Sequence, residues 1–183
     1  MTSSDHFYVV DQRLTGNGIQ YLFISDGVRE IIKIIEYILS NQVDGRPVYN
    51  LGFGDYDSSN ECLLDSPISN NGDHYRVFNT VLNTIPDFFT SFPTAIVAVQ
   101  GSDSGDAFIR QCRHECKKGC KEGECRRAGR RIGLYCSYLN KHFEAFSNEY
   151  IFYGGNVDDE NRLLIEPYKI GKQYDSVLLS KNQ

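Results

Sequence analysis

The chain has 183 residues, a formal net charge of −5 and 40% hydrophobic residues, with 11 Phe and 12 Tyr among them. This length and apolar content predict one domain that builds its core without disulfide bonds. The N-terminus from Met1 to Asp11 lacks the apolar run of a signal peptide, and no apolar run reaches the roughly 18 residues that span a bilayer. We therefore expect a soluble cytoplasmic protein with no membrane contact and with reduced thiols.

Segments rich in β-branched and aromatic residues predict a series of strands in the first third of the chain. The predicted strands are Phe7–Val10, Tyr21–Ser25, Ile31–Leu39 and Val48–Asp55. The segment Ile31–Leu39 also has apolar residues three and four apart, as a helix would, but its five isoleucines favour a strand. The residues between the last two strands, Asn41–Pro47, are predicted to form a loop.

The clearest helical pattern follows, between Val77 and Phe92, where apolar residues recur three and four positions apart. Asn71 or Asp73 precedes it as a candidate N-cap. The continuous apolar run Ala95–Val99 then predicts a fully buried central strand.

The end of the chain predicts a second helix and three more strands. The helix is Arg131–Phe146, with its apolar residues on one side, and the strand Tyr150–Tyr153 ends at Gly154 and Gly155. Leu163–Ile165 and Ser176–Leu179 are predicted to pair with each other as a closing antiparallel pair. The whole chain, 1–183, is thus predicted to be a single α/β (α+β) domain, with two main helices and a central mixed sheet that is mostly antiparallel.

The segment from Ser104 to Arg131 differs from its surroundings and is interpreted as a small insertion rich in cysteine and basic residues. It carries four of the six cysteines, with three residues between Cys112 and Cys116, three before Cys120 and four before Cys125. Within residues 106–131 nine basic residues face four acidic ones, so this segment is positive on an otherwise acidic chain.

The cysteine spacing indicates a zinc site. Cys112, Cys116 and Cys120 would share one face of a helix, and Gly119 and Gly123 break such a helix. The break lets Cys120 and Cys125 turn back, so that four thiolates surround one ion, with His114 as a substitute ligand. A loop stapled by disulfides and free thiols on a basic helix are the alternatives.

The basic residues of the insertion predict contacts with an acidic partner or a nucleic acid. The residues proposed for such contacts are Arg113, Lys117, Lys121 and Arg127. The alternative is a solvated surface whose charge only keeps the insertion soluble.

A second group of polar residues begins in the last predicted strand before the first helix and extends to the start of that helix. Its members are Asn50, Asp55, Asp57, Asp65, Asn70, Asn71, Asp73 and His74. If the strand and the helix dock, Asp55 and the segment 71–73 would meet at one end of the sheet. Such oxygen-rich loops can form a polar pocket or bind a hard cation, whereas the structural alternative is turn and cap chemistry.

The order of three strands, helix, buried strand, helix and two strands resembles the central part of the GCN5-related N-acetyltransferase (GNAT) fold. In that family a strand, loop and helix hold the pyrophosphate of acetyl-CoA, which implies a cofactor site at Asn70, Asn71, Gly72 and Asp73. The helical segment Gly133–Leu139 is similar to the family's second helix, which implies that the candidate catalytic residue is Tyr135. The loop Ser69–Tyr75 has one glycine and no preceding arginine, unlike the phosphate loop of the family.

The chain also resembles a group of small uncharacterised bacterial domains, through Tyr49–Asp55, Ser69–Asp73, Gly101–Ser102, Leu134–Tyr135 and Tyr153–Gly154. That likeness covers most of the chain outside the cysteine-rich segment and implies no activity. Our preferred hypothesis is a non-catalytic binding or regulatory domain, GNAT-like in fold, with a structural zinc-binding insertion. An atypical acyl-CoA-dependent N-acyltransferase and a nucleic-acid-binding protein are the alternatives.

Overall fold

The computed structural model describes residues 6–64, 71–101, 103, 108–110, 120, 125, 128–158, 160 and 162–182. Internal contacts divide the chain into two compact units, Met1–Val97 and Ala98–Gln183, and strand β6 (Ile96–Gln100) contains the boundary between them. Each unit is described by itself below. Together they make an α+β chain with mostly antiparallel strands and two long helices in the described part, as the sequence predicts.

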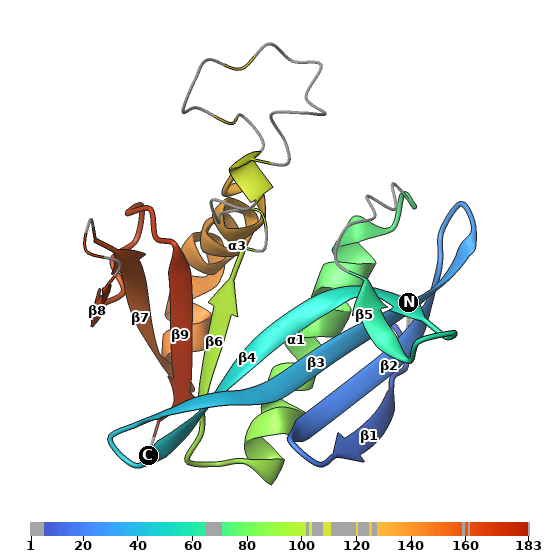
Figure 1. Ribbon diagram of the computed structural model, residues 1–183, viewed down its shortest axis with the longest axis horizontal. Coiled ribbons are helices and arrows are strands. Elements are labelled where there is room, and N and C mark those ends of the chain that lie inside the picture. Colours follow the sequence, from blue (N-terminus) through green and yellow to red (C-terminus); the bar gives the residue numbers. More distant parts are fainter. Residues whose placement is uncertain are drawn as a thin grey trace. The chain divides into compact units, whose positions relative to one another are not determined.

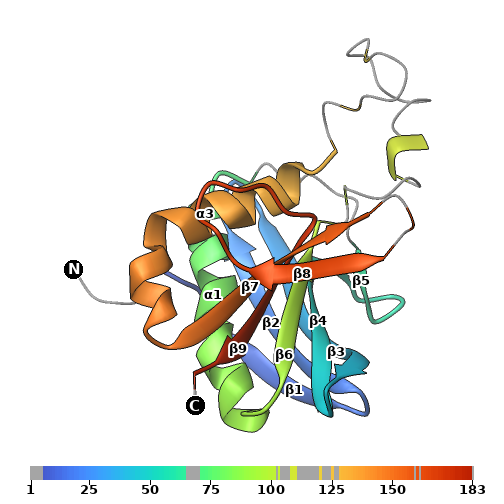
Figure 2. The same cartoon turned by 90° about the vertical axis from the view of Figure 1, so that its left-hand side faces the viewer.

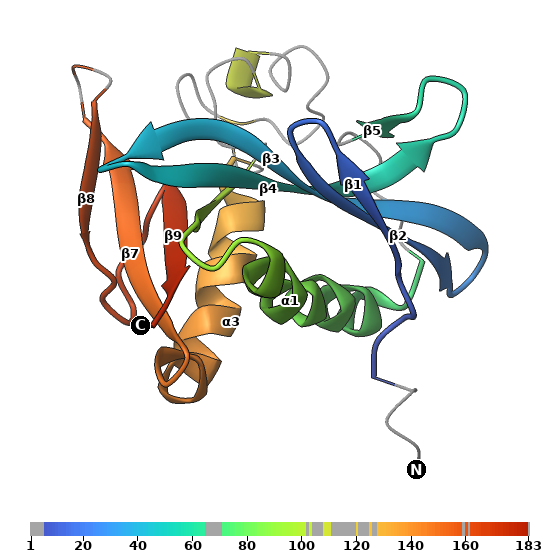
Figure 3. The same cartoon turned by 90° about the horizontal axis from the view of Figure 1, so that it is seen from below.

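The first unit is an antiparallel meander with a helix on one face (Figures 1 and 3). Its strands are β1 (Asp11–Thr15), β2 (Gly18–Asp26), β3 (Glu30–Val43), β4 (Arg46–Asp57) and β5 (Cys62–Leu64), and β5 pairs with β4. The helix α1 (His74–Ser91) follows β5 in the chain.

Aromatic side chains form the contact between α1 and the meander. Tyr37 of β3 stacks on Phe88 of α1 with ring centroids 4.3 Å apart, and Tyr49 of β4 meets the same ring edge-on at 5.2 Å. The Tyr37 hydroxyl forms a 2.9 Å hydrogen bond with Thr84, so its buried oxygen is paired. Because alternate residues of a strand face the same side, β2 adds Ile19, Tyr21 and Phe23 to this core.

The second unit packs helix α3 (Arg130–Ser147) on strands β7 (Tyr150–Val157), β8 (Leu163–Pro167) and β9 (Ser176–Lys181) (Figure 2). Strand β7 lies between β8 and β9 and is antiparallel to both. The core of this unit combines buried residues of α3 with residues from the end of the chain. These are Ile132, Cys136, Leu139, Tyr168, Tyr174 and Val177.

Several sequence predictions are confirmed. Strands β3 and β4 and helix α1 lie where the sequence places them. The apolar run Ala95–Val99 overlaps β6, which is only partly buried: Val97 and Ala98 are buried, whereas Ile96 and Val99 are half-buried. Helix α3 begins one residue before the predicted Arg131.

Two predictions about the first unit are wrong. Phe7–Val10 is not a strand, because the backbone N–H of Tyr8 donates to Thr80 Oγ1 of α1 and its ring stacks on Phe23; the first strand starts at Asp11. Asn41–Pro47 is not a loop, since β3 and β4 continue through it to a tight turn at Asp44 and Gly45, both with positive φ.

Two predictions about the second unit are also wrong. The segments Leu163–Ile165 and Ser176–Leu179 are strands, but each pairs with β7 instead of with the other. Strand β7 also continues beyond Gly154 and Gly155 to Val157. Glycines stand at these positions because the ring of Tyr174 and the side chain of Leu163 occupy the space above them.

Candidate functional site

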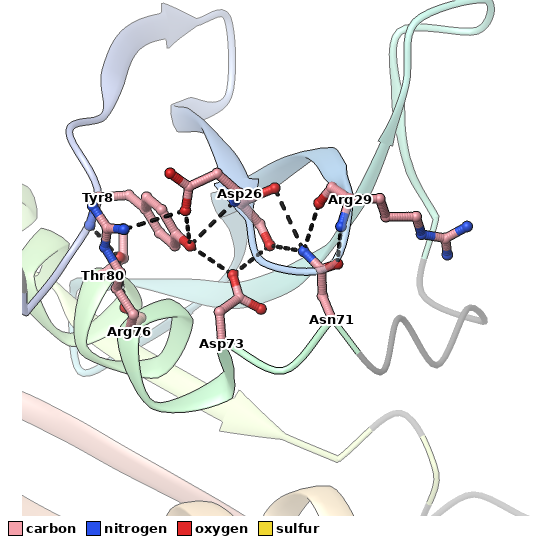
Figure 4. A network of polar contacts seen from close by, with 8 residues as sticks. Tyr8, Asp26, Arg29, Asn71, Asp73, Arg76 and Thr80 are labelled. Atoms are coloured by element: carbon pink, nitrogen blue, oxygen red, sulfur yellow. Dashed lines mark hydrogen bonds and ion pairs between the residues drawn. The ribbon is translucent and has the colours of Figure 1, made fainter.

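The N-terminal end of α1 carries the densest polar network of the described residues (Figure 4). It joins side chains from the N-terminal segment, β2, the segment before α1 and the first turns of α1. We call this network the α1 clasp. Its members are Tyr8, Ser25, Asp26, Asn71, Asp73, Arg76 and Thr80.

Asn71 closes the turn between β2 and β3. Its side-chain amide donates to Ser25 Oγ at 2.7 Å and to the Arg29 carbonyl at 2.9 Å, and its Oδ1 accepts the Arg29 N–H at 2.9 Å. Its own carbonyl accepts the N–H of Val28. Asn71 is only 4% exposed and its bond to Ser25 Oγ is buried, whereas its bonds to the exposed Arg29 are partly buried.

The backbone approaches itself closely at this turn. A Cβ on Gly27 would lie 1.9 Å from the carbonyl oxygen of Asn71, which only glycine avoids. Gly72 has a φ of +82°, the left-handed region that glycine enters without strain. These two glycines therefore allow the segment before α1 to lie against the β2–β3 turn.

Asp73 occupies the N-cap position of α1, as the sequence suggests, but its side chain forms no cap hydrogen bond. Its Oδ2 instead accepts hydrogen bonds from Ser25 Oγ at 2.5 Å and from the Tyr8 hydroxyl at 2.7 Å. Burial acts to raise the pKa of Asp73, but the hydrogen bonds from Ser25 and Tyr8 outweigh it and hold the pKa below 3.8.

Tyr8 lies between two carboxylates. Its phenol oxygen is 2.7 Å from both Asp26 Oδ1 and Asp73 Oδ2, and it accepts the Asp26 N–H at 3.2 Å. Burial, followed by the hydrogen bonds to the two carboxylates, raises the pKa of Tyr8 to about 12. The guanidinium of Arg76 lies 3.9 Å from the centre of the Tyr8 ring and donates to Asp26 at 3.2 Å, so a cation accompanies Asp26 and the Tyr8 ring.

Asp55 reaches the same region through a lysine. Lys33 is buried, stands opposite Asp55 in the β3–β4 register and forms an ion pair with it. Its positive charge also lowers the pKa of Asp73. Lys33 is thus the ion-pair partner of Asp55 and also favours the charged form of Asp73. The sequence predicts these two carboxylates at one end of the sheet.

Exposed side chains surround the clasp. Val28 is 83% exposed and Tyr75 is 75% exposed, although both are large. Arg29 and His74 are exposed beside them, and the His74 ring lies 4.2 Å from the Tyr75 ring. We call Val28, Arg29, His74 and Tyr75 the clasp rim.

The other predicted site residues are placed as follows. Tyr135 lies on α3 in the second unit, where it packs against the buried core of that unit. Cys120 and Cys125 are half-buried. Asn50 and Asp57 lie on β4. The remaining predicted residues lie outside the described residues: Asp65, Asn70, Cys112, Cys116, His114, Arg113, Lys117, Lys121 and Arg127.

Within the described part of the chain, no group of three or more His, Cys, Asp or Glu residues is arranged to hold a metal ion. Because two of the four proposed ligands fall outside that part, the zinc site stays a prediction. None of the described helices is long and apolar enough to cross a membrane.

Sequence analysis missed Tyr8, Ser25, Asp26, Arg76 and Thr80 as members of the polar network. One signal for Ser25 exists: it continues the inward-facing series of alternate β2 residues, where a polar residue needs a buried partner. Tyr8 gives no such signal, because its partners are 18 and 65 residues away.

With this geometry in place, comparison with known proteins defines the class of the chain. Residues 5–107 match a family described as a family of unknown function (DUF6934), which is more than half of the chain. The chain therefore belongs to the DUF6934 family. No curated protein and no solved structure matches it. The matched range contains the whole α1 clasp and ends before Cys112.

Proposed function

We propose that this DUF6934 chain is a non-catalytic binding module that uses the clasp rim as its contact surface. The supporting observation is that the polar side chains at the start of α1 are bonded to the chain itself. Asn71 binds the β2–β3 turn, and Asp73 binds Ser25 and Tyr8. The rim thus stands on a rigid base, while its own side chains are exposed.

The same contacts argue against an acyl-CoA-dependent transferase, although the order of elements supports a GNAT-like fold as part of the proposal. A pyrophosphate at a helix N-terminus needs free backbone amides and positive charge. At α1 the carboxylate of Asp73 already lies beside the first turn, and hydrogen bonds from Ser25 and Tyr8 keep it ionised at neutral pH. A second anion there would meet like charge.

A thermal-shift experiment with acetyl-CoA separates the two functions. The binding module should show no change in unfolding temperature at millimolar acetyl-CoA. A true cofactor present at about 100 times its Kd would stabilise the chain by about 2.7 kcal/mol, which raises the midpoint by several degrees. Such a rise, together with acetyl transfer to an amine, would overturn the proposal.

A capture experiment tests the rim directly. The double variant Val28→Ser/Tyr75→Ala removes the two apolar side chains of the rim without touching the clasp. Leu14→Ser is the matched control, because Leu14 is an exposed apolar residue on β1. A partner held by the native chain and by L14S, but released by the double variant, supports the rim as the contact surface. Equal retention by all three proteins contradicts it.

We further propose that Cys112, Cys116, Cys120 and Cys125 hold one structural Zn²⁺, with His114 as the substitute ligand. The support is the clustering of four cysteines within 14 residues and the two glycines between them. Elemental mass spectrometry of the purified chain should find about one zinc per chain, as expected for a closed four-ligand site. The Cys116→Ser/Cys120→Ser variant should lose it, and zinc-free native protein purified without chelator would remove the proposal.

A further inference from the structure

Strand β8 ends the β9–β7–β8 series of the second unit and, among the described residues, pairs with β7 alone. In an antiparallel ladder, alternate residue pairs exchange two backbone hydrogen bonds. The N–H of Asp158 donates to the carbonyl of Arg162, and the N–H of Tyr168 donates to that of Phe152. The backbone N–H and C=O groups of the even-numbered β8 residues therefore point toward β7. Those of Leu163 and Ile165 point toward the outer edge.

The side chains of this edge are apolar and exposed. Leu163, Leu164 and Ile165 are 45%, 57% and 46% exposed. By the β7–β8 register, Leu163 and Ile165 share a face with three further exposed residues. Those three are Ile151, Tyr153 and Val157 of β7. An apolar edge strand that continues into an apolar face is a typical protein-interaction site.

The sequence of the edge is complementary to itself. Residues 162–166 are Arg-Leu-Leu-Ile-Glu, so a cation and an anion flank three apolar residues. When a second copy runs antiparallel with the two Leu164 residues opposite each other, Arg162 faces the partner's Glu166. Leu163 then faces the partner's Ile165, and the same contacts repeat by two-fold symmetry. Within the chain Arg162 pairs with Asp158 and Glu160, and Glu166 pairs with Lys169 and Lys172, so the contact between copies adds to these ion pairs. Opposite charges and apolar pairs across strands both stabilise such an arrangement.

We propose that two copies of this chain form an antiparallel dimer through β8, centred on Leu164. This register makes Leu163 and the partner's Ile165 the pair that exchanges hydrogen bonds, and symmetry gives four such bonds in all. A register centred on Ile165 would instead place Leu163 opposite the partner's Pro167, which has no N–H to donate. The proposal is independent of the clasp rim and of any bound zinc.

Sedimentation equilibrium of the full chain tests the dimer. The native chain should show twice the monomer mass of 20.8 kDa at micromolar concentration. Ile165→Pro removes two of the four bonds between copies, and because that N–H points away from β7, it removes none within the chain. This variant should be a monomer, whereas Leu14→Ser, which changes an exposed apolar residue on β1, should remain a dimer.

A charge exchange tests the register and guards against misfolded variants. R162E puts two acids opposite each other, and E166R puts two bases opposite each other, so each variant alone should dimerise about tenfold more weakly. An equimolar mixture restores both opposite-charge pairs and should recover the native dimer. A native chain that stays monomeric would overturn the proposal. So would a dimer that persists unchanged in I165P, or a mixture that dimerises no better than its components.

Discussion

At the scale of single residues, Asn71 is the clearest stabilising side chain of the clasp. Asn71→Ala removes four side-chain hydrogen bonds, two of them to the buried Ser25, and leaves the N–H and C=O of Arg29 without their partner. We expect the free energy of unfolding to fall by about 2 to 3 kcal/mol in urea titrations. Asn60→Ala is the matched control, because Asn60 bonds to Asp57 at an exposed turn, and it should cost less than about 0.5 kcal/mol. Equal losses would contradict the buried role of Asn71.

Asp73 should make stability depend on acid pH. Burial acts to raise its pKa, but the hydrogen bonds from Ser25 and Tyr8 hold it below the 3.8 of the unfolded chain, so the unfolded state binds a proton more readily. The contribution of Asp73 is thus complete above that value and is lost as the pH falls toward the folded pKa. Asp73→Asn cannot titrate, so its urea midpoint should fall less steeply than the native one between about pH 5 and 3. Parallel curves would show that Asp73 plays no part in acid sensitivity.

The residues of the clasp show where prediction from sequence ends. Asn71 and Asp73 stand out in the sequence because their side chains suit a turn or a cap. In the structure Asp73 accepts hydrogen bonds from Tyr8 and Ser25, which lie 65 and 48 residues away in the chain. A local pattern indicates that a residue is special, whereas only the tertiary fold determines which distant hydroxyl reaches it.

At the scale of secondary-structure elements, β7 depends on two glycines beneath bulky neighbours. A Cβ on Gly154 would lie 2.1 Å from the ring of Tyr174, and that ring is buried and cannot swing away. We expect Gly154→Ala to lower the free energy of unfolding by about 2 to 3 kcal/mol. Gly133→Ala is the contrasting variant, because Gly133 lies in α3 with nothing near its Cβ position. This variant should raise the free energy of unfolding by about 0.5 to 1 kcal/mol. The two changes should move the thermal midpoint in opposite directions.

The same glycines explain which elements the sequence could predict. Helices α1 and α3 follow from periodic apolar patterns within single segments, and strand β3 follows from its β-branched isoleucines. The paired glycines at 154 and 155 resemble a strand end in the sequence. In the structure they lie inside β7, where the side chains of Tyr174 and Leu163 occupy the space that a Cβ would fill. The strand order β9–β7–β8 cannot be predicted from the sequence either, because the partner of a strand depends on contacts far along the chain.

At the scale of the whole molecule, Asp103 supports the interpretation of the cysteine-rich segment as an insertion. Its carbonyl accepts the N–H of Gly129 at 3.0 Å, and its carboxylate accepts the N–H of Arg131 at 3.0 Å. Two positions more than 25 residues apart in the sequence are thus hydrogen-bonded neighbours. The described positions on either side of the segment, Asp103 and Gly129, therefore lie next to each other.

This closure leads to a prediction about the entire chain. Replacing residues 105–127 by a flexible linker of about four residues should preserve the fold, since a short loop closes at lower entropic cost than a long one. The shortened chain should unfold cooperatively, with a thermal midpoint within about 4 °C of the native one, a change of roughly 1 kcal/mol. The chelator-treated native chain is the control, because it keeps the segment and loses only a bound metal. A shortened chain that aggregates or unfolds without cooperativity, while the chelated chain stays folded, would show that the segment's polypeptide itself is part of the core.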